Sequence, residues 1–510
     1  MVVRIQIANM EMNMITTRIA ILITCFVWAY SATFAVAAQP PRPNIVVILC
    51  DDLGYSDVGF NGATDIRTPS LDALAQAGII CSSGYVPHPF CGPSRMGLFT
   101  GRYPHTFGAP FNLPNSGLGI DEYNRQGVPV DETLISTVLH DAGYFTGALG
   151  KWHMGIDEPF HPNQRGFDEF YGFLGGGHMY FPEKYQAIHQ RQSRTGKAAI
   201  NEYVLPLEHN GAAVQETEYL TDAFSREAVR FVNLAAGKDQ PFFLYLAYSA
   251  PHTPLEAKEE DLKEYAGIAD EKRRTYAAMV HAVDRGVGRL VEALKTTGQW
   301  DDTLIVFFSD NGGKISAGAT NRPLRDGKGS TYEGGYRVPM FFHWPGHLPE
   351  ASRYDRPVTA LDLYPTFAAL AGAELPAGKH LDGVDIWDAL VAGRDTRRDK
   401  LIFALRHRDG YSDVGARRNE WKISRVGQGP WKLFDVDRDP GETRDLSDQH
   451  SDQLAELVGL TEQWSRTHTE PRWFHELKAR DDWKATEMPN FDKTFSLAQP
   501  DEPSWKLGPQ

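Results

Sequence analysis

The sequence predicts an α/β fold: a large central mixed, mostly parallel sheet flanked by helices, with a smaller C-terminal subdomain of antiparallel sheet plus helix. Unbroken apolar runs, typical of strands buried on both faces of a parallel sheet, recur along the chain. Capped helical patterns lie between these runs, as parallel connections require. The chain has 510 residues, which is enough for one large domain and a smaller one.

Four of the apolar runs end in polar side chains. The runs and their endings are 44–50 before Asp51 and Asp52, 144–150 before Lys151 and His153, 242–249 before His252, and 303–309 before Asp310 and Asn311. One acidic pair after a strand is usually part of a turn. Because ligand sites in open α/β sheets gather at the carboxyl ends of the strands, four such endings predict one shared crevice.

The segments around and after these runs complete the predicted architecture. Helices are expected to open at 68–74 and 132–139, where capping residues precede apolar positions. Short strands near 401–404, 421–424 and 431–435 and a helix over 451–464 predict the antiparallel subdomain. We therefore divide the chain into a main domain over 41–390, a subdomain over 391–470, and an aromatic-containing tail over 471–510 that is expected to wrap over the surface.

The N-terminus has the order of a cleaved export signal. Arg18 precedes the apolar stretch 19–34, and the small residues 35–38 resemble a cleavage site, so we expect a signal peptide over 1–38. A membrane anchor is the alternative, but the stretch is short for a span, and no stable membrane span is expected. The absence of an N-x-[ST] sequon fits an exported bacterial protein, periplasmic or secreted.

Charge and cysteine content argue against a nucleic-acid-binding protein and against a protein stabilised by a disulfide framework. A formal net charge of −14 argues against nucleic acid as a partner, because phosphate-binding surfaces are basic. Four cysteines, of which Cys25 lies in the signal, are too few for a disulfide framework in so long a chain. Removal of the signal would leave three cysteines, and an odd number of thiols in an exported protein needs another explanation.

The acidic endings form a candidate metal site. Three carboxylates and one amide oxygen come from Asp51, Asp52, Asp310 and Asn311. Such hard oxygen ligands suit Ca²⁺ or Mg²⁺ rather than zinc. The structural alternatives are a turn at Asp51 and a helix cap at Asp310, but two strands ending alike favour a metal.

Cys91 is a candidate nucleophile. It lies in a Pro- and Gly-rich turn, Pro93 suits the first helical position, and Gly101 suits the end of a helix over 94–100. A helix N-terminus favours an anion, and Arg95 adds positive charge on the first turn. This polar, loop-like setting fits a reactive cysteine better than a structural one.

Four loop cations could bind an oxyanion in the same crevice. They are Lys151, His153, His252 and Lys328. Each alone is more often a solvated surface charge, but together they could hold a tetrahedral oxyanion while a divalent metal takes its other face. The residues thus indicate phosphoryl or sulfuryl transfer without choosing between them.

Two motifs resemble the signatures of type I sulfatases of the alkaline phosphatase superfamily. Residues 91–102 are similar to C-x-P-S-R-x-x-x-L-T-G-R, with Phe99 in the Leu position, and 150–155 resemble G-K-W-H-x-G. The resemblance covers about 41–446 and implies an alkaline phosphatase-like fold. It is close to bacterial carbohydrate sulfatases and to N-acetylgalactosamine-6-sulfatase-like arylsulfatases.

The resemblance implies a sulfatase whose nucleophile is formylglycine. In this family a formylglycine-generating enzyme oxidises the signature cysteine, here Cys91, and the hydrated aldehyde attacks sulfur and later releases sulfate. Pro93 and Arg95 occupy the positions that the maturation enzyme reads. The implied roles are one Ca²⁺ on Asp51, Asp52, Asp310 and Asn311, formylglycine positioning by Arg95, sulfate binding by Lys151 and Lys328, gem-diol collapse by His153, and general acid catalysis by His252.

The substrate is expected to be a sulfated saccharide rather than a simple aryl sulfate. His178 and Arg325 lie close in sequence to these segments and are candidate substrate-binding residues. Two alternatives stay open. A phosphomonoesterase or phosphodiesterase of the superfamily is disfavoured because the chain shows no second set of metal ligands. A catalytically dead sugar-binding protein is disfavoured because none of the expected site positions is missing.

Overall fold

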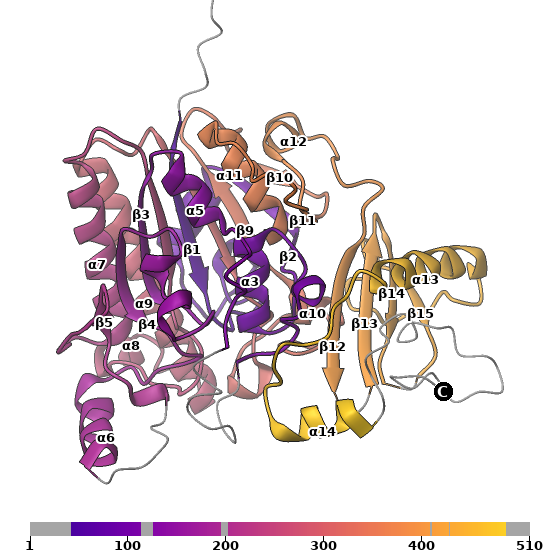
Figure 1. The fold of residues 1–510 in the computed structure, drawn as a ribbon, viewed down its shortest axis with the longest axis horizontal. Coiled ribbons are helices and arrows are strands. Elements are labelled where there is room, and N and C mark those ends of the chain that lie inside the picture. The colour runs from indigo at the N-terminus through magenta and orange to yellow at the C-terminus, as the bar shows by residue number, and fades with distance from the viewer. Residues whose placement is uncertain (1–41, 114–125, 195–201, 409–410, 428, 486–510) are drawn as a thin grey trace, which may run out of the picture. The chain divides into compact units, whose positions relative to one another are not determined.

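The structure, a computed structural model, describes residues 42–113, 126–194, 202–408, 411–427 and 429–485 (Figure 1). The predicted signal peptide over 1–38 lies outside the described residues. The part of the predicted tail (471–510) that follows residue 485 also lies outside them.

The larger sheet of the described residues has eleven strands. In chain order they are β1 (Asn44–Cys50), β2 (Ile79–Tyr85), β3 (Phe145–Lys151), β4 (Glu169–Phe173), β5 (Glu208–His209), β6 (Ala212–Ala213), β7 (Phe242–Ala247), β8 (Thr303–Ser309), β9 (Arg337–His343), β10 (Ser352–Tyr354) and β11 (Val358–Thr359). Their spatial order is β10-β2-β9-β8-β1-β7-β3-β4-β5-β6, and β11 pairs with β2.

The centre of this sheet is parallel. β1 runs parallel to β7 and β8, and β3 runs parallel to β7 and β4, whereas β9 is antiparallel to β2 and β8. All seven residues of β1 and of β8 are buried, which explains why their sequences are continuously apolar instead of alternating. The mixed, mostly parallel sheet predicted from the sequence is therefore confirmed.

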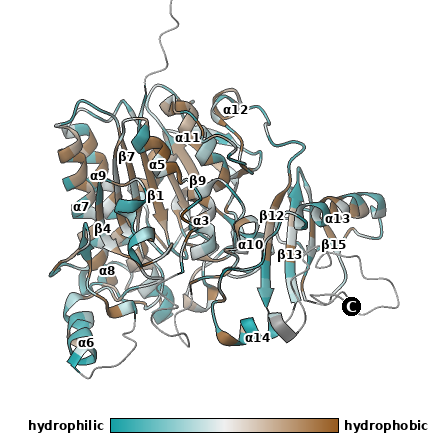
Figure 2. Ribbon diagram, in the orientation of Figure 1, coloured by the Kyte–Doolittle hydropathy of each residue, from teal (hydrophilic) through white to brown (hydrophobic). Residues whose placement is uncertain are grey.

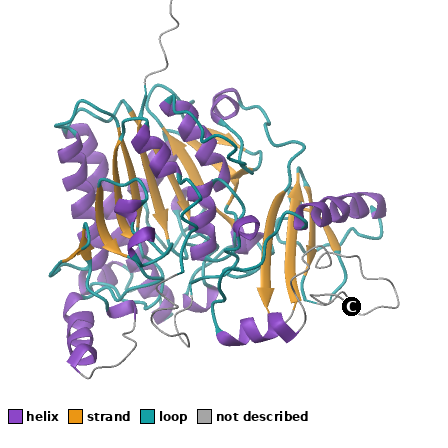
Figure 3. Cartoon of the chain, in the orientation of Figure 1, coloured by secondary structure: helices purple, strands orange, loops and turns teal. Residues whose placement is uncertain are grey.

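Helices cover both faces of the sheet (Figures 1 and 3). Alternate residues of β1 enter two different cores: Ile45, Val47 and Leu49 pack on one face, and Val46, Ile48 and Cys50 pack on the other. The first core includes α3 (Cys91–Thr100), α5 (Ile135–Asp141) and α11 (Leu363–Ala371), and the second includes α2 (Pro69–Gln76), α7 (Leu220–Ala235) and α9 (Glu271–Thr296). Figure 2 shows the apolar residues concentrated along the central strands and the helix faces that meet them.

The other described helices are short or peripheral. They are α6 (Pro182–Arg194), α8 (Glu259–Glu264), α10 (Glu333–Tyr336), α12 (Trp387–Ala392), α13 (Ser451–Ser465) and α14 (Leu477–Ala485). Among the helices that the structure describes, none combines the length and apolar character needed to cross a bilayer.

A second sheet follows in the C-terminal region. Its four antiparallel strands are β12 (Ile402–Arg408), β13 (Tyr411–Arg418), β14 (Trp421–Arg425) and β15 (Lys432–Asp435), in that order. Leu457 and Val458 of α13 pack against this sheet. The predicted antiparallel sheet plus helix is confirmed, although β13 had not been expected, because its sequence YSDVGARR carries few apolar residues.

The chain after α13 returns to the main domain. Trp473 is buried in the first core, and its indole Nε1 donates a hydrogen bond to the Phe111 carbonyl over 3.0 Å. The backbone N–H groups of Thr469 and Arg472 donate to the carbonyls of His105 and Gly108. This segment therefore holds the loop that follows α3.

Candidate active site

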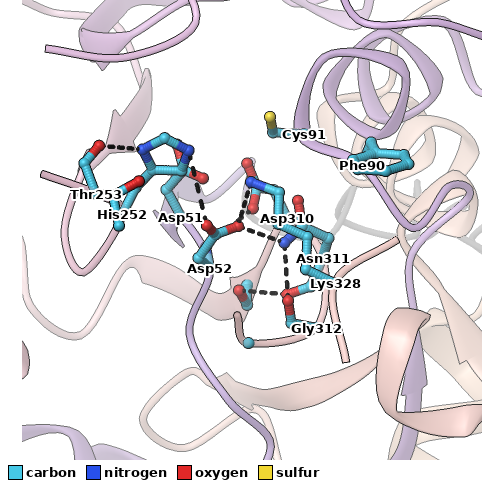
Figure 4. Close-up of polar contacts among 12 residues, drawn as sticks. Asp51, Asp52, Phe90, Cys91, His252, Thr253, Asp310, Asn311, Gly312 and Lys328 are labelled. Carbon is cyan, nitrogen blue, oxygen red and sulfur yellow. Dashed lines mark hydrogen bonds and ion pairs between the residues drawn. The ribbon is translucent and has the colours of Figure 1, made fainter. Parts of the chain in front are cut away.

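The sheet order brings the four polar strand endings together. β8, β1, β7 and β3 are consecutive neighbours, and they run parallel. Their ends carry Asp310 and Asn311, Asp51 and Asp52, His252, and Lys151 and His153, respectively, and each of these seven residues is buried. Asp52 and Asn311, which are 259 positions apart in the chain, thus share one site (Figure 4).

Oxygen atoms of the acidic cluster are left without hydrogen-bond donors. Asn311 Nδ2 donates to Asp52 Oδ1 over 2.8 Å, and Arg95 Nε donates to Asp310 Oδ2 over 2.9 Å. In contrast, Asp51 Oδ1, Asp52 Oδ2 and Asn311 Oδ1 are buried and accept no hydrogen bond from the described residues. Buried polar atoms normally have a partner, and carboxylate and amide oxygens are the ligands that Ca²⁺ and Mg²⁺ prefer. The donor set therefore fits a hard divalent cation.

The charges of the cluster point to the same cation. Burial and the neighbouring Asp51 carboxylate raise the pKa of Asp310 to about 8, although Arg95 acts in the opposite direction. Burial acts to raise the pKa of Asp51 too, but Lys151, His252 and Arg95 outweigh it and hold that pKa below its usual range. A divalent cation would stabilise the ionised form of both carboxyl groups.

Cys91 is the first residue of α3 and lies beside this cluster. One ligand atom from each of Cys91, Asp51 and Asp310 lies within 4.8 Å of the others. The preceding residue, Phe90, is extended, and Gly101 ends the helix with a left-handed φ of 67°. Cys91 therefore lies at the N-terminus of the helix, where free backbone N–H groups favour a negatively charged group.

Arg95 links the helix to the strand ends. Its side chain is fully buried, and Nη2 lies 2.8 Å from Asp310 Oδ2. Nη1 donates to the Lys151 carbonyl over 2.9 Å and to the Tyr245 hydroxyl over 3.2 Å. The guanidinium is thus fixed between β8, β3 and β7.

The two lysines are paired with carboxylates. Lys151 Nζ forms a buried ion pair with Asp51, and Lys328 Nζ lies 2.6 Å from Asp52 Oδ1. Burial opposes the charged form of Lys328, but Asp52 and the other acidic groups beside it outweigh burial and raise the pKa of this lysine. Both ammonium groups therefore stay charged at neutral pH and face the same acidic cluster.

The two histidines are uncharged at neutral pH. Burial lowers the pKa of His252 to about 4 and lowers that of His153 well below its usual value. His252 Nδ1 lies 2.6 Å from the Thr253 carbonyl, so it carries the proton, and Nε2 lies 3.7 Å from Asp52 Oδ2. His153 adopts φ 62°, and a Cβ on Gly176 would lie 2.7 Å from His153 Nε2, so the loop at 176 needs glycine to approach the ring.

His178 and Arg325, the two residues expected to contact substrate, contact other partners. His178 is fully buried, and its ring nitrogens lie 2.7 Å from the carbonyls of Met179 and Leu205. Arg325 stacks over the Tyr332 ring at 3.8 Å and donates to the Glu442 carbonyl over 3.1 Å.

The structure adds site neighbours that the sequence did not reveal. Asn112 Oδ1 accepts a hydrogen bond from the Gly92 N–H over 2.9 Å and lies 3.8 Å from Cys91 Sγ. The Tyr245 hydroxyl contacts Arg95, and the Tyr203 ring lies 6.4 Å from the His252 ring. Tyr245 is inside an apolar strand and Asn112 is in an irregular loop, so no local pattern distinguishes them.

Comparison with known proteins agrees with this geometry. The family model "Sulfatase" matches residues 43–373, and the model "N-sulphoglucosamine sulphohydrolase, C-terminal" matches 327–466. The chain is similar to N-acetylgalactosamine-6-sulfatase of Sus scrofa, at 33% identity over 72% of this chain and 70% of that protein. It is also similar to arylsulfatase A of Homo sapiens, at 33% identity over 82% of this chain and 85% of that protein.

A solved structure matches over most of the chain. It is described as Ps i-CgsB in complex with k-i-k-neocarrahexaose, and it is 56% identical to this chain. The match has a TM-score of 0.86 and covers 89% of this chain and 100% of the other.

Proposed function

The chain belongs to the sulfatase family of sulfuric ester hydrolases, and we propose that it removes sulfate from a sulfated saccharide, using a formylglycine made from Cys91 and one bound Ca²⁺. The observation that carries the proposal is the placement of Cys91 at the start of α3, beside Asp51 and Asp310. A formylglycine at position 91 supplies a nucleophilic hydroxyl from its hydrated aldehyde. A formylglycine-generating enzyme is the partner required for maturation.

Asp51, Asp52, Asp310 and Asn311 would hold the calcium ion, which supplies Lewis-acid polarisation of a sulfate oxygen. Three of their oxygens lack hydrogen-bond donors in the described structure, which supports this assignment. Arg95 orients the residue at position 91 and stabilises negative charge there, because it is fully buried and fixed by four oxygen atoms.

Lys151 and Lys328 bind the anionic end of the substrate. Both are held by carboxylates at the site, which keeps their ammonium groups charged and limits their movement. Compact positive charges at fixed positions select a tetrahedral oxyanion and stabilise charge that develops on its oxygens.

The histidines move protons. His252 donates from Nε2 to the bridging oxygen of the leaving sugar, and the negative charge of the bound sulfate ester favours the protonated ring that this step needs. His153 is neutral, so its ring can accept a proton from a hydroxyl at position 91.

The saccharide class follows from the 56% identical structure described in complex with k-i-k-neocarrahexaose. This oligosaccharide is the first substrate to test. We also propose that the protein is exported, with residues 1–38 as its signal peptide.

The mass of the peptide carrying Cys91 tests the proposal first. In protein made together with a formylglycine-generating enzyme, the peptide should carry an aldehyde in place of the thiol, and the protein should release sulfate from k-i-k-neocarrahexaose. Cys91→Ala should release none. An intact thiol, in cells that convert a control sulfatase, would contradict the mechanism.

The same preparation separates the two alternatives. Turnover of a phosphate ester that exceeds turnover of the sulfate would favour a phosphoesterase. Calcium-dependent binding of the oligosaccharide without sulfate release by the aldehyde form would favour a sugar-binding protein.

A further inference from the structure

A cavity of about 560 Å³ lies beside the active site. Its walls come from the loop at 314–316, the loop at 326–332 and the strands β12 and β13. Two of its residues connect it to the site, since Phe90 precedes Cys91 and Lys328 pairs with Asp52. A cavity of this volume holds more than a single sulfate group.

The lining of this cavity is basic although the whole chain is acidic. Its charged residues are Lys314, Lys328, Arg406 and Arg408, against Asp326 and Asp413. Lys314 forms no ion pair with any residue that the structure describes. Asp413 accepts a hydrogen bond from Arg408 Nε over 2.7 Å, and the Nη groups of Arg408 donate none to the described residues. Positive charge therefore faces this cavity in excess.

Arg406 is held rigidly next to the nucleophile segment. Its Nη1 donates to the Gly329 carbonyl over 2.9 Å, and its guanidinium lies 5.0 Å from the centre of the Phe90 ring. A Cβ on Gly329 would lie 2.7 Å from the Phe90 ring, so the three groups pack closely. A planar guanidinium in a fixed position suits sulfate and carboxylate groups.

Both arginines also line a second cavity on the other side of Phe90, of about 190 Å³. Its lining includes Asn112 and the acidic residues Glu476 and Asp482, so this cavity is not basic overall. Asn112 contacts Cys91, so this cavity also adjoins the nucleophile. A chain of sugars could therefore extend past position 91 along β12.

We propose that Lys314, Arg406 and Arg408 bind a second anionic group of the saccharide, a sulfate or a carboxylate on a sugar next to the one that loses its sulfate. This subsite rests on the proposed function, and it makes the substrate an oligosaccharide with at least two anionic groups. Ile315, which is 56% exposed, adds an apolar surface at the edge of the cavity for a sugar face.

Kinetics on two sulfate esters test the subsite. Lys314→Gln and Arg408→Gln are compared with the wild type on k-i-k-neocarrahexaose and on 4-nitrophenyl sulfate, which has a single anionic group. The ratio of kcat/KM for the oligosaccharide to that for the aryl sulfate should fall about tenfold, mainly through KM, because a charge-assisted contact is lost. Arg438→Gln is the control, since Arg438 is 89% exposed and outside both cavities. An unchanged ratio in both test variants would overturn the proposal.

Binding to the Cys91→Ala protein keeps this test separate from the proposed function. Calorimetry uses two disaccharides, one with two sulfates and no carboxylate, and one with one sulfate and a uronic acid. Adding Arg408→Gln should weaken binding of at least one of them about tenfold, and the one affected identifies the second anion. Unchanged binding of both would contradict the subsite, whereas absent sulfate release by the wild type would contradict only the proposed function.

Discussion

Asp310 is a buried carboxylate in an electrostatically unfavourable environment. Its pKa is raised to about 8 by burial and by the adjacent Asp51, even though Arg95 contacts it directly. Asp51 and Asp52 are better compensated, each by a lysine, yet both keep one oxygen without a hydrogen-bond donor. A single divalent cation would stabilise the ionised form of Asp310 and would bind the two oxygens that lack a hydrogen-bond donor.

Calcium should therefore stabilise the protein through these residues. In the wild type, Ca²⁺ at about a hundredfold above its Kd should add about 2.7 kcal/mol to the free energy of unfolding, because only the folded state presents the site. Asp51→Asn and Asp52→Asn should lose most of this gain. Differential scanning calorimetry with Ca²⁺ and with a chelator measures it.

The matched control is Asp239→Asn, which changes an exposed carboxylate and should keep the full calcium effect. If the two site variants gained as much stability from Ca²⁺ as the wild type, the ion would bind elsewhere.

Two residues of the site also have unusual backbone conformations. Asp52 and His153 adopt positive φ values of 64° and 62° directly after strands. Such conformations cost about 1–3 kcal/mol and are concentrated at functional sites. For Asp52, this conformation accompanies side-chain contacts with Asn311 and Lys328 from other segments of the chain.

At the scale of elements, the segment after α13 supports the active-site loop. Trp473 is 3% exposed and packs in the core formed by α3, α5 and α11. Its indole donates to Phe111, one residue before Asn112, whose side chain bonds to the N-terminus of α3. The segment thus connects the C-terminal region, through Phe111 and Asn112, to the first turn of α3 at Gly92.

Shortening this side chain should destabilise the protein strongly. Trp473→Ala should lower the free energy of unfolding by about 3–5 kcal/mol, because it removes a large buried ring and leaves a cavity. Urea unfolding measures the change. Trp473→Phe keeps most of the buried area and should cost about 1 kcal/mol for the lost hydrogen bond and some packing. Equal losses in the two variants would show that the ring itself is not what anchors the segment.

At the scale of the whole molecule, a cluster of three buried histidines and the half-buried His468 connects distant parts of the chain. His105 lies 5.5 Å from His88, 5.5 Å from His407 and 5.2 Å from His468, measured between ring centres. His88 precedes α3, His407 belongs to β12, and His468 follows α13. The cluster therefore lies where the main domain meets the second sheet.

This cluster should make stability fall in mild acid. Burial, with smaller contributions from His407 and Arg406, lowers the pKa of His88 from 6.5 to about 3. Below pH 6.5 the unfolded chain takes up a proton at this residue, whereas the folded chain takes it up only near pH 3. Stability is therefore lost as the pH falls from 6.5. His88 alone should account for about 2 kcal/mol between pH 7.5 and 5.0.

Urea unfolding at the two pH values measures this loss. In His88→Asn, which can keep an acceptor for the Phe90 N–H, the decrease between pH 7.5 and 5.0 should be about 2 kcal/mol smaller than in the wild type. His380→Asn changes a side chain that is 72% exposed and should show the wild-type decrease. A decrease in His88→Asn that matched the wild type would mean that His88 is not buried in its neutral form.

The sequence by itself determined the parallel centre of the sheet and the identity of the strand endings. Continuous apolar runs are typical of strands that helices cover on both faces of the sheet. The sequence therefore sufficed to predict β1, β7 and β8 as buried parallel strands. The motifs around Cys91 and Lys151 also sufficed to predict the sulfatase family, because their spacing is specific.

The tertiary structure alone decided which groups face one another. The order of the strands places Asp51 between Asp310 and Lys151. The segment after α13 packs back against the main domain and places Trp473 against the loop that contains Phe111 and Asn112. Arg406 and Arg408 came to the site from a strand more than 300 residues after Cys91, with no local pattern to mark them. Contacts between residues far apart in the chain depend on packing across elements, and local periodicity carries no information about such pairs.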